Sequence, residues 1–137
     1  MDRAALAALA GRLAHELPAG AVVALVGPLG AGKTTFAREF ALARGAAVAA
    51  TSPTYTLAHR YPTPHGDVWH LDCYRLRDPE EARDLDWETL ATGNALLVEW
   101  PERAGAWMPV PHCTVTLDHH GETTRRVQVD PAVEPAP

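Results

Sequence analysis

The sequence predicts an α/β fold of three layers, in which a mixed β-sheet is flanked by helices. Helical and apolar strand-like segments alternate in the first third of the chain, which favours a parallel sheet covered by helices. Short strand-like pairs joined by turns follow later and favour antiparallel additions to that sheet. With 137 residues, the chain has the size of one domain. We expect residues 1–130 to form it, followed by a flexible tail at 131–137 that is rich in proline and alanine.

The first third of the chain predicts two helices with a buried strand between them. Leucines recur at helical spacing over residues 3–17, which predicts an amphipathic helix. Residues 21–26 (AVVALV) are all apolar and are flanked by glycines, which fits a strand buried on both faces. Residues 33–44 predict a second helix with Phe36 and Phe40 turned inward, and the glycine that follows is a stop signal.

The rest of the chain predicts short strands and one further helix. Residues 79–92 begin with Pro-Glu-Glu, a favourable helix start, and carry two leucines that could face a core. The last two strands alternate in residue type around a His-His-Gly turn, which predicts a closing hairpin with one wet face. The strand-like stretches 55–61 and 67–72 are also predicted to pair as a hairpin. The predicted strands cover residues 47–50, 55–61, 67–72, 95–98, 113–118 and 125–129.

Composition narrows the possible functions. The net charge is −5 and the sequence pI is about 5.7, which argues against DNA or RNA as a direct ligand because phosphate-backbone binding needs a basic face. The sequence has neither an apolar run long enough to span a membrane nor a secretory leader, so we expect no membrane partner and a cytoplasmic location. Cys73 and Cys113 do not have metal-site spacing and are expected to be buried thiols.

A phosphate-binding loop is the most informative motif. Residues 27–34 (GPLGAGKT) match GxxxxGK[ST] between a predicted buried strand and a predicted helix, which is the context that this motif requires. Gly30 and Gly32 allow positive φ, so that backbone N–H groups can approach phosphate oxygens, and the helix N-terminus adds its positive dipole. A glycine turn that only joins strand to helix would need no lysine. Lys33, however, is the one lysine among 12 basic residues.

The chemistry of the loop predicts a three-layer P-loop NTPase fold. A compact lysine ammonium suits the β- and γ-phosphates better than the planar fork of arginine. The Thr34 hydroxyl is a ligand for Mg²⁺, which bridges the phosphates of a bound nucleoside triphosphate such as ATP. The residues predicted to contact the nucleotide are Leu29, Gly30, Ala31, Gly32, Lys33, Thr34 and Thr35.

Two acids follow predicted strands and are candidates for the rest of the site. Asp72 and Glu99 stand at the ends of apolar stretches, where ligands bind in open α/β sheets, so each could hold magnesium or orient water. Each could equally be a solvated acid at a strand end. His70 shares a strand face with Asp72, but without a third ligand it is a better hydrogen-bonding or packing partner than a metal ligand. Trp100 is either a core residue or a stacking surface.

A polar turn at residues 51–54 (TSPT) leaves two interpretations open. It could be a plain turn, since Ser-Pro favours one, or a switch segment whose hydroxyl groups meet the γ-phosphate. The arginines at positions 75, 77 and 103 are expected to be surface residues rather than catalytic arginine fingers.

Four motifs together extend the interpretation beyond the phosphate loop. They are GPLGAGKTT at 27–35, SPTYTL at 52–57, HLDCYRL at 70–76 and VEWPE at 98–102. In this order and spacing they resemble the TsaE (YjeE) family, small bacterial ATPases of tRNA threonylcarbamoyladenosine (t6A) synthesis. The resemblance covers about residues 5–129. One departure is Pro28, where the family often has aspartate, at a position whose side chain points away from the phosphates in most P-loops.

The resemblance implies a function and partners. It implies an ATPase that works with TsaB and TsaD, of which TsaD transfers the threonylcarbamoyl group, while the ATP cycle resets the complex between turnovers. Hydrolysis by the protein alone is then expected to be slow, and tRNA to be met only through the complex. The resemblance also implies these roles: phosphate and magnesium for Lys33 and Thr34, a switch for Ser52 and Thr54, magnesium and the hydrolytic water for Asp72 and Glu99, and a further functional position for Trp100.

Three rival functions follow from the same loop. A small-molecule kinase would need an acceptor pocket and usually an arginine-rich lid, and the sequence has no lid-sized insertion. A GTPase would need an Asn-Lys-x-Asp string, which cannot occur here because Asn94 and Lys33 are the only residues of their types. A non-catalytic binding module would hold ATP tightly without turnover.

Overall fold

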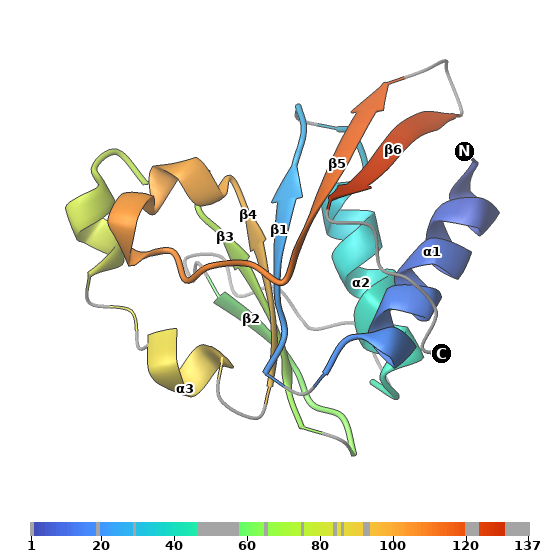
Figure 1. The fold of residues 1–137 in the computed structure, drawn as a ribbon, viewed down its shortest axis with the longest axis horizontal. Helices are drawn as coiled ribbons and strands as arrows, with labels where there is room; N and C mark the ends of the chain where they lie inside the picture. Colours follow the sequence, from blue (N-terminus) through green and yellow to red (C-terminus); the bar gives the residue numbers. More distant parts are fainter. Residues whose placement is uncertain are drawn as a thin grey trace.

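A six-stranded mixed sheet separates two layers of helices (Figure 1). The computed structural model describes residues 2–18, 20–28, 30–46, 58–64, 66–74, 76–83, 85, 87–91, 94–119 and 124–130. The strands are β1 (Val22–Val26), β2 (Ala58–Tyr61), β3 (Val68–Asp72), β4 (Ala95–Glu99), β5 (Cys113–His119) and β6 (Arg125–Asp130). Their order in the sheet is β2-β3-β4-β1-β5-β6. The four central strands are parallel, whereas β2 and β6 add to the edges as antiparallel hairpin partners, so the predicted mixed sheet is confirmed.

One face of the sheet is covered by two regular helices, α1 (Arg3–Glu16) and α2 (Lys33–Ala43), as Figure 1 shows. The Asp2 side chain caps α1 by accepting a 2.9 Å hydrogen bond from the backbone N–H of Ala5. The guanidinium of Arg44, just after α2, donates to the carbonyls of Ala14 and Leu17 at the end of α1. These bonds satisfy carbonyls that a helix end leaves unpaired, and they join the two helices.

The core under α1 and α2 follows the alternation of the strands. Val23 and Leu25 of β1 and Leu97 of β4 point into this layer, and Phe36 and Phe40 of α2 pack on them. Each of these side chains is fully buried, as the sequence predicts for a strand between two helical layers. This packing fixes α2 against the sheet, and with it the position of Lys33 and Thr34 at the start of the helix.

The opposite face is covered by short helical turns. They are η1 (Pro79–Ala82), α3 (Trp87–Ala91), η2 (Pro101–Arg103) and η3 (Gly105–Trp107), where η marks a 3₁₀ helix. A second apolar cluster lies between them and the sheet, and it includes Leu71, Leu96 and Leu90. Within the described parts of the chain, no helix is long and apolar enough to cross a membrane.

The single helix predicted over residues 79–92 is wrong. The structure has a 3₁₀ turn and a separate five-residue helix instead. The carbonyl of Ala82 explains the break, because it accepts hydrogen bonds from the backbone N–H of Leu85 at 3.2 Å and from the indole N–H of Trp87 at 2.9 Å. The chain turns there before α3 begins. The strand predicted at 47–50, the beginning of the one predicted at 55–61, and the tail at 131–137 lie outside the described residues.

Candidate functional site

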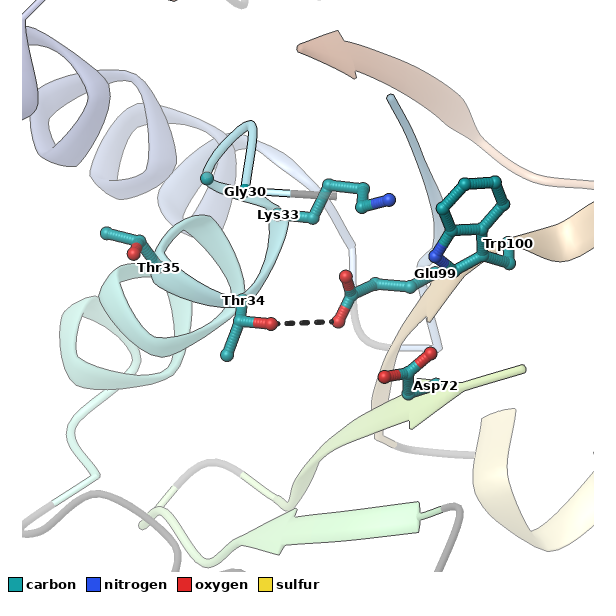
Figure 2. Close-up of a pocket in the computed structure, with 8 residues that line it drawn as sticks. Gly30, Lys33, Thr34, Thr35, Asp72, Glu99 and Trp100 are labelled. Carbon is teal, nitrogen blue, oxygen red and sulfur yellow. Dashed lines mark hydrogen bonds between the residues drawn. The ribbon is translucent and has the colours of Figure 1, made fainter. Parts of the chain in front are cut away.

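A cleft of about 280 Å³ opens at the carboxyl ends of the parallel strands (Figure 2). It lies where the sequence places the site, between the start of α2 and the ends of β3 and β4. The structure therefore brings the phosphate loop and both candidate acids to one place. The cleft is lined by Gly30, Gly32, Lys33, Thr34, Thr35, Asp72, Glu99 and Trp100.

The phosphate loop needs glycine for two different reasons. Gly27 has a φ of +151°, and a Cβ built on it would lie 2.1 Å from the carbonyl oxygen of Leu117, so any side chain would collide with β5. Gly32 has a φ of +104° in the left-handed region and directly precedes α2. This geometry lets the chain turn from β1 into α2, so that the first N–H groups of the helix face the cleft.

The remaining loop residues differ in what they can offer a ligand. The side chain of Ala31 is fully buried in the core, so only its backbone could contact a nucleotide. Thr35 lines the cleft, although its side chain lies on the side of α2 turned away from Glu99 in Figure 2. Leu29, predicted to contact the nucleotide, lies outside the described residues, as do Ser52 and Thr54 of the proposed switch.

Lys33 lines the cleft although it is only 4% exposed. Its ammonium donates a hydrogen bond to the carbonyl of Gly27 and lies 3.9 Å from the centre of the Trp100 ring. Burial lowers the pKa of Lys33, whereas the negative charges of Glu99 and Asp72 oppose that shift. The loop thus presents one desolvated positive charge directly across from two carboxylates.

The two acids end neighbouring parallel strands in register. Asp72 of β3 pairs with Glu99 of β4, which sets their carboxylates side by side at the edge of the sheet. Oε2 of Glu99 accepts a 3.2 Å hydrogen bond from the Thr34 hydroxyl, drawn in Figure 2, and lies 2.5 Å from Nε2 of His70. Oδ1 of Asp72 accepts from the backbone N–H of Tyr74 at 3.0 Å. The hydrogen-bonding role predicted for His70 is confirmed, with Glu99 as its partner.

The pKa of Glu99 is set by opposing effects. Burial raises it, but the hydrogen bond and charge of His70, the Thr34 hydroxyl and the charge of Lys33 together lower it below the ordinary value. Glu99 is therefore an ionised carboxylate at neutral pH, despite being only 4% exposed.

The donor atoms of the cleft fit a magnesium ion that is shared with phosphate. A hydroxyl has one donor and two acceptor lone pairs, so Thr34 can donate to Glu99 and still offer oxygen to a cation. Mg²⁺ prefers such hard oxygen ligands and is usually held by one or two carboxylates together with phosphates and water. Within the described ranges, no three His, Cys, Asp or Glu side chains gather into a metal site of their own. The side chains fit a cation that arrives with a nucleotide better than a resident metal.

Trp100 lies on the cleft wall in a strained conformation. Its φ of +54° makes it the one described residue other than glycine with a positive φ, which costs about 1–3 kcal/mol. In this conformation its indole lies against the Lys33 ammonium. The centres of the Trp100 and Tyr74 rings lie 5.1 Å apart. The Arg103 guanidinium stacks on both, 5.0 Å from the Tyr74 ring centre and 5.6 Å from the Trp100 ring centre. Both interpretations of Trp100 therefore hold in part, because it is half-buried against the second apolar cluster and its ring also stacks beside the cleft.

Tyr74 was missed by reasoning from sequence, although it belongs to the motif that contains Asp72, and that proximity is the only signal it carries. Arg103 is exposed and does not line the cleft, as expected for a surface residue. Arg103 stacks behind Trp100, and its guanidinium also donates to the carbonyl of Leu76 at 3.5 Å, so it is held beside the cleft rather than on its wall.

Comparisons with known proteins agree with the architecture of this site. The family model described as "Threonylcarbamoyl adenosine biosynthesis protein TsaE" matches residues 1–127. The Treponema pallidum protein named tRNA threonylcarbamoyladenosine biosynthesis protein TsaE is 35% identical over 131 residues, 93% of each chain. The protein of that name from Rickettsia felis is 38% identical over 118 residues, 85% of this chain and 69% of the relative. The crystal structure of Bacillus subtilis YdiB superposes with a TM-score of 0.73 at 26% identity, covering 93% of this chain and 78% of that one.

Proposed function

Because the chain belongs to the TsaE family of tRNA threonylcarbamoyladenosine biosynthesis proteins, we propose that it is a magnesium-dependent ATPase acting with TsaB and TsaD. The observation that carries the proposal is the meeting of Lys33, Thr34 and Glu99 in one cleft, at the end of a glycine loop. Such a constellation suits phosphoryl transfer, in which positioning and charge stabilisation supply most of the catalysis.

Nucleotide binding falls to the loop and to the start of α2. The backbone N–H groups of the loop and the positive end of the helix dipole favour the negative phosphates. Lys33 adds its charge, and phosphate oxygens would replace the Gly27 carbonyl as its partners. A magnesium ion held by Thr34 and Asp72 would neutralise charge that develops on the phosphates.

Hydrolysis requires a group that orients water. Glu99 is ionised, lies beside Thr34 and faces the cleft, so we assign the hydrolytic water to its carboxylate and magnesium to Asp72. Trp100 closes the wall next to Lys33 and excludes bulk water from the phosphate end of the cleft.

The partners and the place of the reaction complete the proposal. We assign the threonylcarbamoyl transfer to TsaD and the resetting of the complex between turnovers to ATP hydrolysis by this chain. A net charge of −5 disfavours direct binding of this chain to the tRNA phosphate backbone. We therefore assign contact with tRNA to the other members of the complex. The cytoplasm is the compartment in which this reaction takes place.

The test is ATP hydrolysis by the purified protein, first alone and then with TsaB and TsaD. We expect slow hydrolysis that rises with the partners, because a residue supplied in trans can contribute ~10³–10⁵ in rate. The Lys33→Ala variant is the control for contaminating ATPases. A rate that ignores the partners would contradict the accessory role. ATP binding without turnover in the full mixture would instead support a non-catalytic binding module. Transfer of the γ-phosphate to an added acceptor would support a kinase.

A further inference from the structure

His70 occupies a position where the sheet otherwise places core residues. It lies on β3 between Val68, which faces the core under α2, and Asp72, which lines the cleft. Its neighbour in register on β4 is Leu97, another core residue, and His70 itself is 3% exposed. Burying a polar ring there is unfavourable unless it is hydrogen-bonded. A leucine would fill this layer at less cost, so the imidazole needs an explanation other than packing.

The explanation is the contact with Glu99. Nε2 of His70 lies 2.5 Å from Oε2 of Glu99, and both side chains are about 5% exposed or less. Two acceptors without a proton would repel at this distance, so a hydrogen bond joins the two atoms, and an N–H at Nε2 is the donor that the ring can offer to the carboxylate. The Thr34 hydroxyl bonds the same oxygen, so neither bond uses Oε1. In Figure 2 the second carboxylate oxygen of Glu99 lies on the side of Lys33.

We infer that His70 is a positioning residue: it holds Oε2 of Glu99 so that Oε1 is directed into the cleft. The inference rests on the proposed ATPase function, because it is for hydrolysis that the direction of Oε1 matters. Thr34 alone holds the carboxylate less firmly, since its bond is 3.2 Å long and its oxygen is also the proposed ligand for magnesium. Without His70, the three side-chain torsions of Glu99 could take it to other rotamers.

Two substitutions of His70 and one matched control separate positioning from packing. His70→Leu keeps an apolar side chain in the layer but removes the donor, whereas His70→Gln keeps a side-chain N–H that can reach Glu99. His59→Leu is the control. His59 pairs with His70 across β2 and β3, with ring centres 5.8 Å apart, and removing it deletes a neighbouring imidazole without touching the bond to Glu99.

The kinetic readout is kcat and KM for ATP in the presence of TsaB and TsaD, together with the melting temperature. We expect His70→Leu to lower kcat by about 10–100-fold, the usual cost of losing an orienting partner, with KM nearly unchanged. His70→Gln should recover kcat to within about tenfold of the wild type. His59→Leu should keep the wild-type kcat. An unchanged kcat in His70→Leu, or a kcat that falls only in step with melting temperature, would overturn the inference.

A second readout does not depend on activity. In the protein alone, the Nε2–H proton of His70 should give a low-field NMR signal that is protected from exchange. It should vanish in His70→Leu and in Glu99→Ala, and persist in His59→Leu. A signal that persists in Glu99→Ala would overturn the contact itself. If the wild type shows this signal but never hydrolyses ATP, the proposed function fails; if it hydrolyses ATP and His70→Leu does so equally well, the positioning role alone fails.

Discussion

The two walls of the cleft are assembled in different ways. One wall consists of Gly30, Gly32, Lys33 and Thr34, which are close neighbours in the sequence, after β1 and at the start of α2, and both glycines have positive φ. The other wall consists of Asp72 and Glu99, which end two strands and meet only when β3 and β4 pair in register. We call them the loop wall and the acid wall.

This difference separates two tasks. The loop wall offers N–H groups and one ammonium, which attract phosphate whether or not a reaction follows. The acid wall is a network in which Glu99 is held by Thr34 and His70, and such a network matters most for the geometry of the reaction. Variants of the loop wall should therefore affect binding, and variants of the acid wall should affect turnover or the requirement for magnesium.

The largest effect is expected on the loop wall. Lys33→Ala should abolish ATP binding, with a loss in affinity of at least about 100-fold, because two or more charge-assisted bonds to phosphate are removed. Isothermal titration calorimetry with ATP and magnesium measures it. The fold should persist, since the contacts of the ammonium are with the Gly27 carbonyl and the Trp100 ring. An affinity equal to that of the wild type would remove Lys33 from the phosphate site.

The next effect is expected on the acid wall. Glu99→Ala should lower ATP turnover by about 10²–10⁴-fold, the usual contribution of a positioned base, and spare ATP affinity by comparison. Steady-state hydrolysis with TsaB and TsaD, paired with calorimetry, gives both numbers. Glu99→Gln serves as the isosteric control, since it keeps an oxygen that can accept from Thr34 but carries no charge. Equal losses of binding and turnover would erase the distinction between the walls.

The loop wall could be predicted from sequence because its causes are local. Glycine at positions 27 and 32, the flanking apolar strand and the one lysine all lie within a dozen neighbouring positions. The central strands were predicted for a similar reason, since a run of apolar residues implies burial on both faces. The acids were identified as candidates, but the bond of Glu99 to His70 requires the register between β3 and β4, and its bond to Thr34 requires the placement of α2 beside β4. One sequence contains neither.

Other features depended on tertiary contacts that no local pattern reports. The helix predicted over residues 79–92 is broken because the Trp87 indole takes the carbonyl of Ala82, a competition that helix propensity ignores. The left-handed backbone conformation of Trp100 could not be predicted from the sequence either. An aromatic residue before proline favours extended conformations, and only the surrounding structure can hold it at a φ of +54°.

A smaller effect on the acid wall would sharpen the division of labour between its two carboxylates. Asp72→Ala should raise the magnesium concentration needed for half-maximal hydrolysis about tenfold, which corresponds to about 1.4 kcal/mol of lost cation affinity. A magnesium titration of the ATPase rate measures it. Glu102→Gln removes a nearby negative charge that acts on Lys33 without lining the cleft, and should leave the requirement unchanged. An unaltered magnesium dependence in Asp72→Ala would count against Asp72 as a ligand.

The smallest effect concerns two cysteines, one in each of the two apolar clusters. Cys73 follows Asp72, whereas Cys113 pairs with Val23 of the strand that leads into the loop. Both are fully buried, and burial raises their pKa values to about 12 and about 11, respectively. An unfolded thiol has a pKa of about 8.5, so this burial favours the folded state below about pH 8.5, an advantage that is lost as the pH rises toward 11–12.

At pH 8, iodoacetamide should therefore modify neither thiol until the structure opens locally, because the thiolate is the reactive form. Cys73 should react first, since short turns cover its cluster, whereas Cys113 lies in the cluster under α1 and α2. Mass spectrometry of peptides after timed alkylation measures both rates, with the urea-unfolded chain as the reference. If Cys113 reacted first, or both reacted at one rate, the cluster under the short turns, which adjoins Asp72 through Cys73, would open no more easily than the cluster under α1 and α2. The two helical layers would then open together as a single cooperative unit.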